Sequence, residues 1–170
     1  MAELLLPLRQ LFEYFDAFES SIAIRESQYL YPGLLTAHVV ALTMFAGLIL
    51  MMDLRLLGVG NMQTPFSQLQ RRLFPYQMVG MAFSVVTGLA LVYAQPMRFF
   101  VNIFFWVKMF MMALAGLNAL AFHYLTYNSV SRWDKDPILP PAARLAGALG
   151  LALWVGVVVS GRLIAYNWFQ

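Results

Sequence analysis

The sequence predicts an all-α integral membrane protein, a four-helix bundle with an N-terminal amphipathic helix at the membrane interface. Of its 170 residues, 61% are hydrophobic and only 11% are charged, a composition typical of membrane proteins. Four apolar stretches are each long enough to cross about 30 Å of hydrocarbon. Because this length leaves room for one compact bundle, we expect residues 1–170 to form a single membrane domain without a separate soluble domain.

The segment before the first span, residues 8–20 (LRQLFEYFDAFES), alternates apolar and charged residues at helical spacing. Leu8, Leu11, Phe12 and Phe15 fall on one face of such a helix. The pattern predicts a helix that lies on the membrane surface with its apolar face in the lipid. The alternative is a docking helix for a partner protein.

We place the four spans near residues 30–52, 76–93, 100–124 and 144–166. Small residues recur every four positions on three of them, and such stripes let two helix backbones approach closely. The stripes comprise Gly80, Ser84 and Gly88 on the second span, Ala115 and Ala119 on the third, and Gly156 and Ser160 on the fourth. They predict the helix contacts of the bundle, although the flat edge of a cofactor is a further use for such a stripe.

The basic residues between the spans predict the orientation of the chain. One side of the membrane receives six of them, namely Arg55, Arg71, Arg72, Arg132, Lys135 and Arg144, and the other side receives Arg9, Arg25 and Arg98. The richer side is expected to be cytoplasmic. We therefore expect a multi-pass protein of the cell inner membrane with both termini on the periplasmic side. The net charge of +3 resides at the ends of the spans, and no basic helix or arm points to nucleic acid.

Two ionisable residues lie inside the apolar stretches, His38 in the first and Lys108 in the third. The first and third spans should cross the bilayer in the same direction. A rise of 1.5 Å per helical residue then puts both side chains roughly 10–14 Å below the same face. Ionisable groups at such depth are costly and usually mark a site with a partner. Two nitrogen donors at matched depth make a metal or haem pocket the first hypothesis.

Each of these residues also has a structural interpretation. His38 is either a metal ligand or an interhelical hydrogen-bonding residue. Lys108 either reaches up to the outer surface or stays in the bundle, neutral, paired or bound to a metal. The second, third and fourth spans contain no Asp or Glu with which Lys108 could pair, which favours the pocket.

Arg162, about one turn from the outer face, and Arg25 on the same side are candidates for cofactor binding. Haem b carries two propionates that must be neutralised near the water boundary, and arginine pairs with carboxylates through two hydrogen bonds. The alternative role for Arg162 is an interface anchor. We thus predict that His38 and Lys108 bind the metal, and that Arg162 and Arg25 complete a haem b site.

Other potential ligands fit less well. His123 ends the third span at the inner face, roughly 15–20 Å in depth from His38, so the two cannot share one iron. The chain has eleven methionines, but they are scattered over both depths, which leaves copper as an alternative cofactor. The absence of cysteine excludes disulfides, iron–sulfur clusters, c-type haem and thiolate zinc sites.

Three segments carry a family resemblance. Residues 31–58 (YPGLLTAHVVALTMFAGLILMMDLRLLG), with FFWVKMFMMALAGLNAL and WVGVVVSGRLIAY, resemble a bacterial family of small four-span membrane proteins without an assigned function. More distantly, the arrangement is similar to copper-resistance D-type membrane proteins and to the small four-helix protoporphyrinogen oxidase that binds haem b. That oxidase places a histidine on its first span and a lysine on its third, positions that would be His38 and Lys108 here. Fold and ligands alone do not transfer its activity.

The sequence therefore favours a membrane protein that binds haem b and transfers electrons. Its partner would be a redox protein at the outer face, or the chain would be one subunit of a larger redox complex. An oxidoreductase role for such a subunit stays open. The alternatives are a copper-handling or small-solute membrane protein, and a structural membrane subunit.

Overall fold

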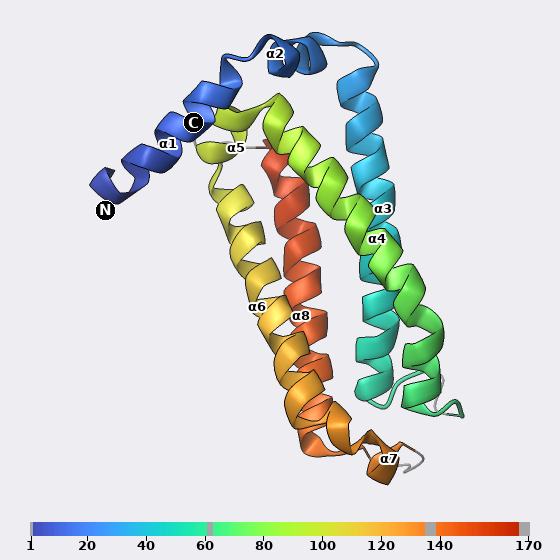
Figure 1. The fold of residues 1–170 in the computed structure, drawn as a ribbon. Coiled ribbons are helices and arrows are strands. Elements are labelled where there is room, and N and C mark those ends of the chain that lie inside the picture. Colours follow the sequence, from blue (N-terminus) through green and yellow to red (C-terminus); the bar gives the residue numbers. More distant parts are fainter. Residues whose placement is uncertain (1, 61–62, 135–138, 167–170) are drawn as a thin grey trace.

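The computed structural model describes residues 2–60, 63–134 and 139–166, and four long helices dominate it (Figure 1). They are α3 (Leu30–Leu56), α4 (Phe66–Ala94), α6 (Ile103–Leu125) and α8 (Pro141–Leu163). Each lies in a segment that is long and apolar enough to cross a membrane. The described residues contain no strand, so the predicted all-α membrane bundle is confirmed.

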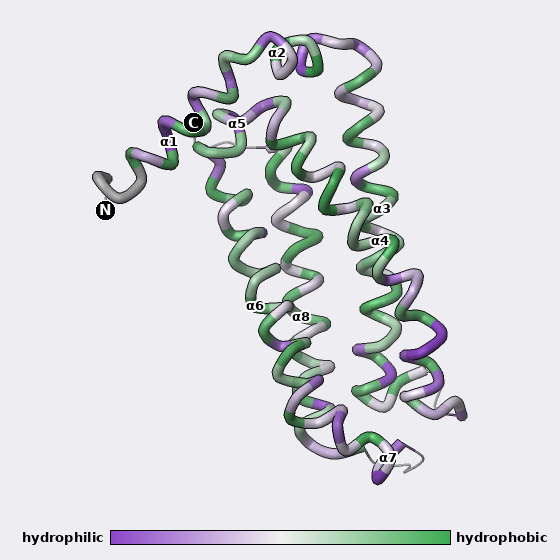
Figure 2. The backbone as a smooth tube through the Cα atoms, in the orientation of Figure 1, coloured by the Kyte–Doolittle hydropathy of each residue, from purple (hydrophilic) through white to green (hydrophobic). Residues whose placement is uncertain are grey.

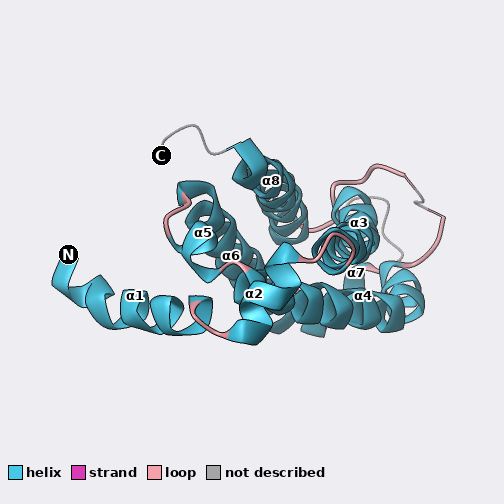
Figure 3. Ribbon diagram, turned by 90° about the horizontal axis from the view of Figure 1, so that it is seen from above, coloured by secondary structure: helices cyan, strands magenta, loops and turns pink. Residues whose placement is uncertain are grey.

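The four helices form two pairs joined along one side. α3 packs against α4, α6 packs against α8, and α8 also packs against α3. Within the described part of the chain, α4 and α6 make no substantial contact with each other. Seen along the bundle, α3 and α8 therefore connect the pairs, while α4 and α6 lie on the other side (Figure 3).

The outside of the bundle is apolar, as a lipid environment requires. Val86 on α4 and Phe110 on α6 are each 65% exposed. Hydrophobic residues run along all four long helices, whereas hydrophilic residues gather at α2 (Glu19–Glu26) and at the opposite end of the bundle (Figure 2). Large exposed apolar surfaces of this kind mark a membrane-embedded protein.

Three short helices lie at one end of the bundle, here called the terminal end. They are α1 (Ala2–Asp16), α2 and α5 (Pro96–Phe100), and α1 extends sideways from the bundle, across the direction of the long helices (Figures 1 and 3). The amphipathic segment expected over residues 8–20 is thus divided, because α1 ends at Asp16 and α2 begins at Glu19. The buried Ser21 hydroxyl fixes α2 by donating to the carbonyl oxygen of Tyr93 at 2.8 Å.

The opposite end, called the loop end, holds the turn between α3 and α4, the 3₁₀ turn Tyr127–Ser129 and α7 (Val130–Trp133). The buried Arg55 guanidinium closes the first turn by donating to the Thr64 carbonyl oxygen. Asp134 accepts hydrogen bonds from the backbone N–H and hydroxyl of Ser67. Lys135, one of the six basic residues counted for the orientation, lies outside the described residues.

Two span boundaries differ from the expected ones. The first helix continues past Met52 to Leu56, and the second begins at Phe66 rather than near Tyr76. The expected start followed Pro75, which lies inside α4. Proline removes one backbone hydrogen bond, but membrane helices tolerate it because neighbouring groups satisfy the freed carbonyl.

The small-residue stripe of α4 packs against α3, as predicted. A Cβ atom at Gly80 would lie 3.1 Å from the Cβ of Phe45, and one at Gly88 would lie 3.1 Å from the Cε1 of His38. The closest approach of a glycine to the backbone of another helix, however, is one that the sequence analysis did not identify. A Cβ at Gly147 of α8 would lie 2.7 Å from the backbone oxygen of Asp53, so α8 contacts α3 almost backbone to backbone.

Candidate functional sites

His38 lies on α3 with its ring against α4. Its Nδ1 is 3.1 Å from the carbonyl oxygen of Ser84 and 3.1 Å from the hydroxyl oxygen of Thr87. Gly88 leaves the space that the ring occupies. The expected interhelical hydrogen bond of His38 is therefore present.

These hydrogen bonds determine the tautomer of His38. The Thr87 hydroxyl donates to the carbonyl oxygen of Phe83 at 2.6 Å, so towards His38 its oxygen acts as an acceptor. The Ser84 carbonyl can only accept. Because both partners of Nδ1 are acceptors, Nδ1 carries the proton, and the Nε2 lone pair stays available. Metal-binding histidines are commonly oriented in this way, by an N–H donated to a backbone carbonyl.

Lys108 on α6 lies near the same region. It is near enough for its charge to act on the His38 imidazole, and a shared site of the two residues stays a prediction. A Cβ at Gly161 of α8 would lie 3.6 Å from the Lys108 Nζ, which places the ammonium against α8. Among the described residues, no hydrogen bond or ion pair engages the Lys108 side chain.

The two arginines of the predicted site have other partners. Arg25 forms an ion pair with Asp16, with 2.9 Å between Nη1 and Oδ1. Arg162 donates to the hydroxyl of Tyr166 at 2.7 Å, and its guanidinium lies 4.9 Å from the centre of the same ring. Both arginines belong to the terminal end, but each is engaged by a neighbour in its own part of the chain.

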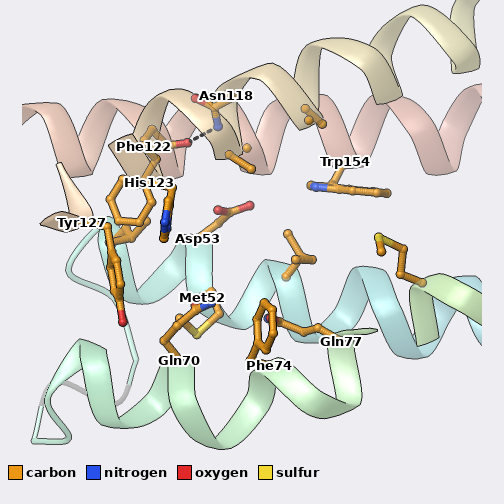
Figure 4. Close-up of a pocket in the computed structure, with 18 of the residues that line it drawn as sticks. Met52, Asp53, Gln70, Phe74, Gln77, Asn118, Phe122, His123, Tyr127 and Trp154 are labelled. Atoms are coloured by element: carbon orange, nitrogen blue, oxygen red, sulfur yellow. Dashed lines mark hydrogen bonds between the residues drawn. The ribbon is translucent and has the colours of Figure 1, made fainter. Parts of the chain in front are cut away.

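A cavity of about 650 Å³ occupies the other half of the bundle, towards the loop end. Side chains from α3, α4, α6 and α8 line it, and their arrangement is shown in Figure 4. Its walls are mainly apolar and aromatic, with a few polar groups among them. This volume and composition are typical of sites for small organic ligands.

Asp53 is the polar residue of this cavity that sequence analysis missed. Its side chain points into the cavity from α3 (Figure 4), and the residue is only 8% exposed. The carboxylate oxygen Oδ2 has no hydrogen-bond partner among the described residues. A Cβ at Gly150 of α8 would lie 2.6 Å from both carboxylate oxygens, so the carboxylate lies where glycine leaves space on α8. The expected span ended at Met52, one residue before Asp53, which is why this acid was not counted.

His123 also lines the cavity rather than only marking the membrane boundary. Its ring is stacked on Tyr127, with 5.5 Å between the ring centres and 20° between the planes. Asn118, one to two turns earlier on α6, joins α6 to α8 by donating to the carbonyl oxygen of Ala146 at 2.9 Å. Within the described ranges, no three His, Cys, Asp or Glu side chains are grouped so as to hold a metal ion.

Comparison with known proteins identifies one family. A family model described as "Family of unknown function (DUF6644)" matches residues 29–167, which include all four long helices. This agrees with the resemblance to a small membrane protein family without an assigned function. Neither the curated proteins nor the solved structures contain a match. The comparisons thus provide no link to copper-resistance D-type proteins or to the haem-binding oxidase.

Proposed function

The chain belongs to DUF6644, a family of unknown function, and we propose that it is a membrane protein of electron transfer that binds haem b through His38. The supporting observation is that the Ser84 carbonyl oxygen and the Thr87 hydroxyl oxygen of α4 both lie 3.1 Å from the Nδ1 of His38, which favours a proton on Nδ1 and a lone pair on Nε2. An imidazole prepared in this way is a common axial ligand of haem iron.

Lys108 is the proposed second ligand or a residue in contact with the macrocycle. Its charge acts on His38, and no described residue pairs with its ammonium. The donor set therefore suits haem, because an imidazole and an amine both donate nitrogen lone pairs. Bound haem would supply one-electron chemistry, and this chain would supply the ligands and the apolar surroundings that set the reduction potential.

Arg25 and Arg162 are the proposed partners of the haem propionates. Both lie at the terminal end, on the same side of the bundle as His38 and Lys108. Binding a propionate would require Arg25 to share its bond to Asp16, and Arg162 to share its bond to Tyr166. We place this end at the periplasmic face of the inner membrane, where a redox partner protein would dock.

A visible spectrum of the purified protein tests this function. We expect a Soret band that shifts on reduction with dithionite, and we expect His38→Ala to abolish it. His123→Ala is the matched control, because His123 lies in the other half of the bundle and should not affect haem. A colourless protein that binds copper would favour the copper-handling alternative. A protein with neither cofactor would favour a structural subunit whose His38 only joins α3 to α4.

A further inference from the structure

The cavity at the loop end is separate from the proposed haem site and has a polarity of its own. Asp53, Gln70 and His123 lie towards the loop end, where Tyr127 also lies, and Arg71 lines the cavity as well. The two other polar lining residues are engaged by backbone carbonyls, since Asn118 donates to Ala146 and Gln77, near Trp154, donates to Leu48. The part near Trp154 faces the middle of the bundle (Figure 4). A ligand that matches this cavity has a polar head near the membrane boundary and an apolar remainder towards the bilayer centre.

The cavity also has an opening to the lipid. α4 and α6 both line it, yet within the described residues they make no substantial contact with each other. Phe74 and Met81 on the α4 side are 49% and 40% exposed. An apolar chain can therefore leave the cavity between α4 and α6 and continue into the bilayer.

Asp53 specifies the head of the ligand. Its carboxylate is more than nine-tenths buried, faces the cavity, and keeps one oxygen without a partner among the described residues. A buried carboxylate oxygen without a donor is unfavourable, so a ligand that brings a hydrogen-bond donor to Oδ2 gains affinity here. Gly150 leaves the space that the carboxylate occupies, because a Cβ at that position would lie 2.6 Å from both oxygens.

Aromatic rings specify the shape of that head. Phe74, Phe122, Tyr127 and Trp154 come from three sides of the cavity (Figure 4). Flat rings pack well against such walls in offset or edge-to-face arrangements. A ligand that combines a flat ring, a hydrogen-bond donor on that ring and an apolar chain matches the cavity. An alkyl hydroquinone has these three features.

We propose that this cavity binds a bilayer-soluble alkyl hydroquinone, whose ring hydroxyl donates a hydrogen bond to Asp53 and whose chain passes between α4 and α6. The inference concerns binding alone and does not depend on haem. Ionised Asp53 only accepts, so in that state the hydroxyl form of the ring binds and the oxidised quinone form, which has no donor, binds more weakly.

The test uses the full chain in phosphatidylcholine nanodiscs, with decylhydroquinone as the probe and tryptophan fluorescence as the readout, since Trp154 lines the cavity. We expect saturable quenching that Trp154→Phe removes. Asp53→Leu should weaken binding at least about tenfold, because the hydrogen bond to a charged acceptor is lost. Asp53→Asn should weaken it less, by about three- to tenfold, because the amide oxygen still accepts.

Glu13→Gln is the matched control, since it also removes one negative charge but lies on the exposed α1. It should bind decylhydroquinone like the wild type. Circular dichroism and size-exclusion chromatography check that each variant is folded, and Asp53→Asn, which keeps the size of the side chain, gives the result if Asp53→Leu does not fold.

Three results would overturn the proposal. The first is saturable binding of decylhydroquinone with the same affinity in Asp53→Leu as in the wild type, and the second is an affinity for decylquinone equal to that for decylhydroquinone. The third is tighter binding of decylammonium than of decylhydroquinone, lost as fully in Asp53→Asn as in Asp53→Leu. The last would identify the head as a cation, because a cation needs the charge of Asp53 and not merely an acceptor. Because the haem spectrum is measured separately, failure of this proposal leaves the proposed function intact, and the reverse also holds.

Discussion

Replacing Gly147 by alanine should destabilise the bundle, because the new side chain would meet the backbone of α3. The new Cβ would lie 2.7 Å from the backbone oxygen of Asp53 and 2.8 Å from the Cβ of Leu56. Neither atom can rotate away, since one belongs to the backbone and the other is attached directly to it. Overpacking of this kind costs about 1–3 kcal/mol, and a rigid obstacle places the cost near the upper limit. Alanine regains about 1 kcal/mol of helix propensity, so the expected net loss is about 2 kcal/mol.

Equilibrium unfolding in mixed micelles with increasing dodecyl sulfate measures this free energy. Gly47→Ala on α3 is the control, because a Cβ there meets nothing within 4 Å and should leave stability unchanged or slightly raised. Gly150→Ala should lie between the two, since its obstacle is the end of the Asp53 side chain, which can turn away. Asp53→Ala should relieve the strain of Gly150→Ala but not that of Gly147→Ala. Equal stability of Gly147→Ala and Gly47→Ala would refute the close contact between α3 and α8.

Three further predictions concern the terminal end and the orientation. Lys108→Arg should alter the haem spectrum, because guanidinium stays protonated and cannot donate a lone pair. Arg162→Lys should weaken haem binding without changing the shape of the spectrum. A wild-type spectrum from Lys108→Arg would show that Lys108 is not a ligand of the iron. Gly88→Ala should disturb the same spectrum, because its Cβ would lie 3.1 Å from the His38 ring. In the control Gly80→Ala the new Cβ meets Met44 and Phe45, so the spectrum should stay unchanged. Equal effects of the two substitutions would argue against the contact between His38 and α4. Reporter fusions after Gln63 and at the C-terminus should be cytoplasmic and periplasmic respectively, and a cytoplasmic C-terminus would reverse the orientation.

The number and order of the spans could be predicted because hydrophobicity is a local property of the sequence. The matched depth of His38 and Lys108 was argued only from the helical rise and the alternation of span direction, and their joint role in a site stays a prediction. Asp53 could not be found in this way. Its significance depends on a boundary one residue beyond the expected span and on a glycine of α8, ninety-seven positions later, that accommodates its carboxylate.

The cavity was beyond sequence analysis for a related reason. A cavity forms where two helices fail to meet, and the sequence does not say which pairs meet. The methionines illustrate this, because they appeared scattered along the chain, yet Met52, Met78, Met81 and Met112 line one cavity from three helices. His123 likewise lines the cavity together with residues of α3 and α4, and the sequence does not show that α6 faces these two helices.

Glycine has the same role beside His38 and beside Asp53. The His38 ring lies against Gly88, and the Asp53 carboxylate lies against Gly150. In each case the small residue belongs to a neighbouring helix, so close helix packing and the placement of a polar group are achieved by one contact. A stripe of small residues therefore makes space for a polar side chain, in addition to close helix packing, when such a side chain lies opposite it on the neighbouring helix. By contrast, Gly80 meets only apolar atoms of α3, and there the close approach serves packing alone.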